Sequence, residues 1–235
     1  MKKLLCAVLS VCMLLTFVGC DKKEVAVENE VEVAPEGSAA DVEVEDFEEN
    51  FSDNLSEEEL AKASHLSAEQ KKIILQKNKN LLKKLALGFK TSRLDIEIDD
   101  KSGEVIMDSS ILFGNDETEV SESGKAFLRK FSRAYASVIC DEEYKGFISK
   151  IVVEGHTDTN GSYDYNMQLS QKRAENVKAV CLADDVGHNA RIKNILDSKL
   201  HAVGCSFDRP VVDDAGNVDM AASRRVTFRF LINID

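Results

Sequence analysis

The chain has 235 residues and a formal net charge of −12 at pH 7, but this charge is unevenly distributed. Residues 21–60 hold sixteen Asp and Glu against two Lys, so residues 61–235 carry no net charge once Lys2 and Lys3 are counted. The excess therefore describes an acidic segment and not a binding face. Such a segment repels phosphates, which excludes nucleic acid as an expected partner.

Residues 1–19 are typical of a secretion signal. Lys2 and Lys3 precede an uncharged apolar run over residues 4–18. As a helix this run would cover about 22 Å, short of the roughly 30 Å hydrocarbon core, so we expect cleavage and not a permanent membrane span.

A candidate lipidation site ends this segment. Phe17-Val18-Gly19-Cys20 resembles a bacterial lipobox, although Phe17 replaces the usual Leu. We therefore expect Cys20 to carry lipid, including palmitate, as the mature N-terminus. Its acyl chains would supply the two or more anchors that stable membrane attachment requires. The alternative is an ordinary signal peptide that contains Cys20 by chance.

Three cysteines, Cys140, Cys181 and Cys205, would remain in an oxidising compartment. Because their number is odd, at most one disulfide can form among them, and their spacing does not resemble a metal site. Buried, unpaired thiols are therefore favoured, and a single disulfide is the alternative.

The next two segments are a tether and a helical region. Residues 20–55 are rich in Glu, Val and Ala, which predicts a disordered acidic tether because closely spaced glutamates repel one another. Residues 56–89 begin with a capping-box pattern, and a second one starts at Ser67. We expect the apolar face of this region to pack on the domain that follows, ending near Gly88. A protein partner bound through residues 56–88 is the alternative.

Residues 90–235 have the pattern of an α+β domain. An alternating strand, a Gly-containing turn and a second strand predict a hairpin, after which helical and strand periodicities alternate. We expect a mixed sheet with helices on one face. The predicted elements are strands at 94–98 and 104–107, a helix at 124–139, a strand at 147–154, a helix at 166–182, and strands at 201–204 and 225–232.

The polar residues with the clearest chemistry follow the strand at 147–154. The stretch Gly155-His156-Thr157-Asp158 leads through a loop into a helix that carries Arg173. A carboxylate beside a guanidinium suits a ligand with both an ammonium and a carboxylate, because Arg binds a carboxylate through two parallel hydrogen bonds. The alternative is an ordinary salt bridge between Asp158 and Arg173.

Four separated motifs resemble the OmpA C-terminal-like family in order and spacing. They are Gly155-His156-Thr157-Asp158, Leu169-Ser170, Arg173-Ala174 and Ser223-Arg224-Arg225-Val226. The resemblance runs from about residue 110 to residue 232 and implies a β-α-β-α-β-β sandwich with its core at 108–232. It also implies binding of peptidoglycan stem peptides through the zwitterionic end of their diamino acid, usually meso-diaminopimelate.

The resemblance assigns roles to individual residues. Asp158 would accept from the ligand ammonium, and Arg173 would clamp the ligand carboxylate. Asn166 would hydrogen-bond the ligand or hold the loop, and Arg224 matches the first Arg of the terminal pair, where Ser223 replaces the commoner Asn. Asn115 would face the same pocket.

The resemblance therefore implies a noncatalytic, lipid-anchored tether between membrane and cell wall. A stator- or scaffold-like anchor for a protein complex is the alternative, although residues 4–18 lack the ionisable residue of an ion-conducting helix. We expect no enzyme, cofactor or metal: His156 more simply braces the loop.

Asp21 resembles an inner-membrane retention signal, but related lipoproteins favour the outer membrane, facing the periplasm.

Overall fold

The structure is a computed structural model that describes residues 63–99 and 102–234. The predicted signal at 1–19, the tether at 20–55 with Cys20, and the start of the helical segment at 56–62 lie outside the described residues. Among the helices in the described part of the chain, none combines the length and apolar character needed to cross a membrane.

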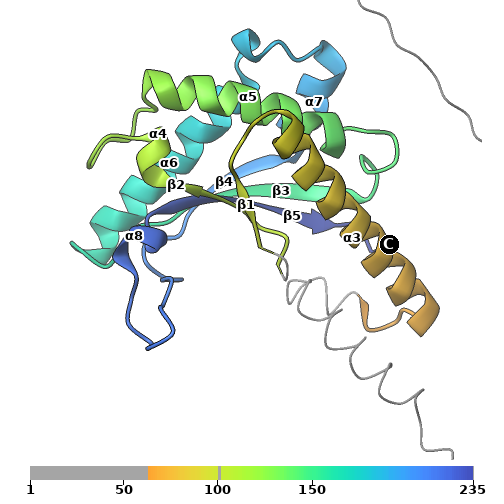
Figure 1. The fold of residues 1–235 in the computed structure, drawn as a ribbon, viewed down its shortest axis with the longest axis horizontal. Coiled ribbons are helices and arrows are strands. Elements are labelled where there is room, and N and C mark those ends of the chain that lie inside the picture. The colour runs from red at the N-terminus through yellow and green to blue at the C-terminus, as the bar shows by residue number, and fades with distance from the viewer. Residues whose placement is uncertain (1–62, 100–101, 235) are drawn as a thin grey trace, which may run out of the picture. The chain divides into compact units, whose positions relative to one another are not determined.

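The described residues form a mixed α+β fold (Figure 1). In chain order the elements are α3 (Ala68–Thr91), β1 (Glu97–Ile98), β2 (Val105–Asp108), α4 (Ser109–Leu112), α5 (Glu122–Ile139), β3 (Ile148–Gly155), α6 (Tyr163–Leu182), the 3₁₀ helix η1 (Asp184–Val186), α7 (Ala190–Lys199), β4 (Leu200–Gly204), α8 (Met220–Ser223) and β5 (Arg225–Ile232).

The strands form one five-stranded sheet in the order β1-β2-β5-β3-β4. All neighbours are antiparallel except β3 and β4, which are parallel and joined through α6 and α7. This confirms the predicted fold class. The predicted hairpin is present as well, with Gly103 in the left-handed region at φ 69°.

The core lies on the face of the sheet covered by α3, α5 and α6 (Figure 1). Inward-pointing residues of β3 and β5, such as Ile151, Val153 and Phe228, are at most 1% exposed. The Phe131 ring of α5 lies 4.7 Å from the ring of Phe228 and 5.6 Å from that of Phe89 on α3. Helix α3 is therefore part of the same core as the sheet.

Helix α3 begins as predicted but ends later than expected. The Ser67 hydroxyl accepts from the Gln70 backbone, and the Gln70 side chain accepts from the Ser67 backbone, so the predicted capping box is present. The predicted end near Gly88 is wrong, because the helix continues to Thr91 and buries Phe89. The change of direction comes at Arg93, at φ 53°.

Two other expectations differ from the structure. The first strand of the hairpin covers only Glu97–Ile98, because the chain is still leaving α3 at Leu94, whose backbone N–H donates to the Phe89 carbonyl. Helix α7 has no counterpart among the predicted elements. It is only ten residues long, and its apolar face is short: Leu196 is buried, and Ile192 and Ile195 are partly buried beside it.

The three cysteines are free thiols, as the sequence favoured, with Cys140 and Cys181 buried and Cys205 half-buried. Burial raises the pKa of Cys140 to about 11 and that of Cys181 to about 12. Both thiols are therefore protonated and unreactive at neutral pH.

The opposite face of the sheet carries an ionic network centred on Glu154, whose side chain is buried. Its carboxylate accepts from Arg209 and, at 3.1 Å, from Arg229, and Arg209 also bridges to Glu104 at 3.3 Å. The side chains of Glu154, His156 and Cys205 each offer an atom that could ligate a metal ion, and these three atoms lie within 4.8 Å of one another. The surrounding guanidinium groups, those of Arg209 and Arg229, oppose the binding of a divalent cation there.

The network predicts acid-sensitive stability. Burial by itself raises the pKa of Glu154, but His156, Arg209 and Arg229 together lower it to about 2 from an ordinary 4.5. Because its folded-state pKa is depressed, ionised Glu154 contributes to the free energy of unfolding. This contribution is present above pH 4.5 and is lost as the pH falls toward 2. It amounts to roughly 3 kcal/mol.

Urea unfolding of wild type and Glu154→Gln at several pH values measures this contribution. Wild type should be the more stable protein at pH 7, and the gap should close between pH 4.5 and 2. A gap that stays constant over that range contradicts the assignment.

Candidate functional site

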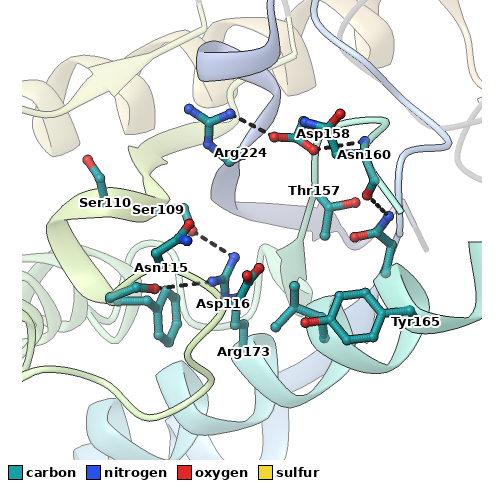
Figure 2. Close-up of a pocket in the computed structure, with 14 residues that line it drawn as sticks. Ser109, Ser110, Asn115, Asp116, Thr157, Asp158, Asn160, Tyr165, Arg173 and Arg224 are labelled. Carbon is teal, nitrogen blue, oxygen red and sulfur yellow. Dashed lines mark hydrogen bonds and ion pairs between the residues drawn. The ribbon is translucent and has the colours of Figure 1, made fainter. Parts of the chain in front are cut away.

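A pocket of about 550 Å³ opens beside the carboxyl end of β3 (Figure 2). Its walls come from α4 and the loop after it, the loop between β3 and α6, α6 itself, and the end of α8. The lining residues are Ser109, Ser110, Phe113, Gly114, Asn115, Asp116, Thr157, Asp158, Asn160, Tyr165, Asn166, Leu169, Arg173 and Arg224. All five ligand-binding residues predicted from the sequence are among them.

The loop that carries Asp158 is held by its own hydrogen bonds. The Asp158 carboxylate accepts from the Asn160 backbone N–H at 2.9 Å, and the Asn166 side chain donates to the Asn160 carbonyl at 2.7 Å. Gly161 turns the chain at φ 89°, and the Ser162 hydroxyl caps α6. Asp158 is therefore positioned before any ligand arrives. Of the two roles expected for Asn166, the structure shows that of holding the loop.

Arg173 projects from α6 into the opposite side of the pocket (Figure 2). It is 6% exposed, and its guanidinium stacks over the Phe113 ring at 5.0 Å. Nε donates to the Glu117 carbonyl at 2.8 Å, while the contacts to Ser109 Oγ and the Gly114 carbonyl are long, at 3.4 and 3.5 Å. Within the described residues, no carboxylate forms an ion pair with Arg173.

Burial lowers the pKa of Arg173, an effect opposed by the charge of Asp116. Arginine nevertheless remains protonated in proteins. The pocket therefore contains a fixed, largely buried positive charge.

The partner of Asp158 is Arg224 and not Arg173. Arg224 Nη1 donates to Asp158 Oδ2 at 2.7 Å, and Figure 2 shows the two side chains pointing toward each other. The simple salt bridge between Asp158 and Arg173 that the sequence left open is thus not formed. Asn115 lies exposed at the rim of the same pocket.

Several lining residues were not predicted from the sequence. Ser109 and Ser110 come from α4, Tyr165 from the first turn of α6, and Asp116 from a loop in which it adopts φ 54°. Their positions depend on how α4 and its loop pack against α6. One sequence signal was available, since an Asn-Asp pair favours a turn that admits positive φ.

Two glycines place α6 against the sheet. A Cβ on Gly155 would lie 2.2 Å from the Ser170 carbonyl oxygen, and a Cβ on Gly204 would lie 2.6 Å from the Gln171 backbone nitrogen. The Gly204 N–H donates to the Gln171 side chain, and the Ser206 N–H donates to Ser170 Oγ. Arg173 follows these contacts by about one helical turn, which sets its place in the pocket.

Sequence comparisons identify relatives of this chain. It is 34% identical over 150 residues to the Zorya protein ZorB of Escherichia coli, covering 60% of this chain and 62% of that protein. It is 31% identical over 130 residues to the outer-membrane lipoprotein YfiB of Pseudomonas aeruginosa, covering 55% and 67%. It is 28% identical over 88 residues to the peptidoglycan-associated lipoprotein of the same species, covering 37% and 47%.

A solved structure has the same fold. The crystal structure of a putative MotB-like protein from Desulfovibrio vulgaris superposes with a TM-score of 0.50 at 17% identity, covering 69% of this chain and 95% of that one. The family model described as "OmpA family" matches residues 112–224, which include Asp158, Arg173 and Arg224. The chain belongs to the OmpA family.

Proposed function

We propose that this protein is a noncatalytic, lipid-anchored envelope protein that binds peptidoglycan stem peptides in the pocket and so ties a membrane to the cell wall. The observation that carries the proposal is Arg173, a largely buried guanidinium without a carboxylate partner in the described residues. A buried charge is costly unless it is paired. An anionic ligand group would supply the missing charge.

The ligand's carboxylate would bind Arg173, whose two longest hydrogen bonds are weak enough to be exchanged. The ligand's ammonium would bind the Asp158 carboxylate across the pocket. It would either share that carboxylate with Arg224 or displace Arg224 from it. This arrangement of charges matches the free end of a diamino acid such as diaminopimelate. Peptidoglycan as the source of that group is supported by family membership and by the name of the peptidoglycan-associated relative.

A noncatalytic role is supported by the chemistry of the lining. The hydroxyls at the pocket are those of Ser109, Ser110, Thr157 and Tyr165, and the lining described here contains no imidazole to activate them. Binding and positioning are therefore the activities that these residues support.

Attachment to the outer membrane, facing the periplasm, is the second part of the proposal. It is supported by the lipobox-like segment ending at Cys20 and by the likeness to an outer-membrane lipoprotein. Asp21 leaves the inner membrane as the alternative. The acidic residues 20–55 would then separate the lipid from the domain.

Binding to the wall is tested by cosedimentation of the full chain with purified diaminopimelate-type peptidoglycan. Wild type should pellet, whereas Asp158→Ala and Arg173→Ala should each lose about 2–5 kcal/mol of binding free energy, since the opposite ligand charge is left unpaired. That loss corresponds to about 30-fold or more in affinity.

Asp184→Ala and Arg191→Ala are the matched controls, because both residues are exposed and their ion partners, Lys193 and Glu142, lie outside the pocket. The controls should pellet like wild type. Retention of binding by both folded pocket variants would assign the wall contact to another surface.

Lipidation is tested separately with Cys20→Ala in the native host. Wild type should incorporate a labelled palmitate analogue and fractionate with the outer membrane, because acyl chains hold it there. The variant should lose the label. A variant that keeps the label would contradict lipidation at Cys20, and wild type in the inner membrane would correct the location.

A further inference from the structure

Helix α3 exposes a stripe of four lysines, Lys72, Lys79, Lys83 and Lys90. Their spacings of seven, four and seven residues place them on one side of the helix over a length of about 27 Å. None of the four has an ion partner among residues 63–99 and 102–234, whereas Lys84 on the same helix pairs with Glu143 at 2.5 Å. The stripe is therefore an unneutralised cationic surface.

Two large apolar side chains lie exposed on the same helix, Ile73 at 58% and Leu87 at 62%. They are fourteen residues apart, which places them on one side of the helix about 21 Å from each other and beside the lysine stripe. Single exposed apolar residues are common on proteins. Here they accompany a row of unpaired charges, so the surface suits an occupant that is both acidic and apolar.

We infer that residues 41–53 of the same chain occupy this surface. This segment holds seven Asp and Glu and no Lys or Arg, and it interleaves them with Val42, Val44, Phe47 and Phe51. Its carboxylates match the lysine stripe, and its apolar residues match Ile73 and Leu87. The composition of this segment therefore fits the surface.

The chain is long enough for this contact. Residues 54–62 could span about 30 Å when extended, which allows the segment to turn back onto α3 from Ala63. Thirteen extended residues reach about 43 Å, more than the length of the stripe. A short linker also keeps the segment at an effective concentration of about millimolar, which favours it over a protein partner present at lower concentration.

The contact would shorten the acidic tether at low ionic strength and release it at high ionic strength. This consequence rests on the proposed function, because it changes how far the lipid can lie from the wall. The contact itself does not depend on peptidoglycan binding, so the experiment below contains no peptidoglycan and its outcome is independent of that proposal.

The test uses a tryptophan reporter in the full chain, which contains no native Trp. Phe47→Trp should emit at shorter wavelength and resist acrylamide quenching at low salt. Both effects should disappear at about 1 M salt, where charges are screened beyond about 3 Å. Adding Lys79→Glu and Lys83→Glu should raise quenching several-fold at low salt. Lys130→Glu with Lys172→Glu, at exposed lysines on α5 and α6, is the matched control and should change nothing.

A second readout is carbodiimide cross-linking followed by mass spectrometry, which should join carboxylates of residues 41–53 to lysines of the stripe. A reporter that is equally quenched at both salt concentrations, at Phe47 and also at Phe51→Trp, overturns the proposal. So does an exposed reporter combined with a loss of binding to phosphatidylglycerol vesicles in the lysine variant, because the surface would then belong to a membrane.

Discussion

The pocket depends on the close approach of helix α6 to the ends of strands β3 and β4. This approach requires the absence of a side chain at Gly155 and Gly204, where a Cβ would lie within 2.6 Å of the α6 backbone. Hydrogen bonds from Gly204 and Ser206 to side chains of α6 fix the same contact. Arg173 is thereby held opposite the loop of Asp158, and both groups are positioned by the sheet and not by a ligand.

A buried charge is paired on one face of the sheet, whereas the buried charge in the pocket is not paired by a carboxylate of the described residues. On the face away from the helices, Glu154 is surrounded by arginines, and its charge is compensated within the protein. In the pocket, Arg173 is equally buried, but its hydrogen-bond partners among the described residues are carbonyl and hydroxyl oxygens. A charge that is paired within the protein needs no ligand, whereas a fixed charge that forms no ion pair within the described residues is suited to binding an anion from outside. The proposed function follows from this difference.

The mixed sheet was predicted because the strand and helix periodicities are clear. Five pocket residues were predicted because the motifs around Asp158, Arg173 and Arg224 resemble those of the OmpA C-terminal-like family in order and spacing. The sequence did not predict helix α7, which has only ten residues, or the end of α3, where packing of Phe89 overrides the preference of Gly88 for a helix end. The pairing of Asp158 with Arg224, and the approach of Asp116, arise from residues far apart in the chain. Such contacts leave no local pattern.

The most direct measurement is calorimetric titration of the full chain with soluble stem peptides that end in diaminopimelate or in lysine at the same position. Because lysine lacks the side-chain carboxylate that Arg173 would bind, the account predicts binding of the diaminopimelate peptide and a loss of about tenfold or more with the lysine peptide. Equal affinity for the two peptides, or binding of neither, would contradict recognition of a zwitterion in this pocket.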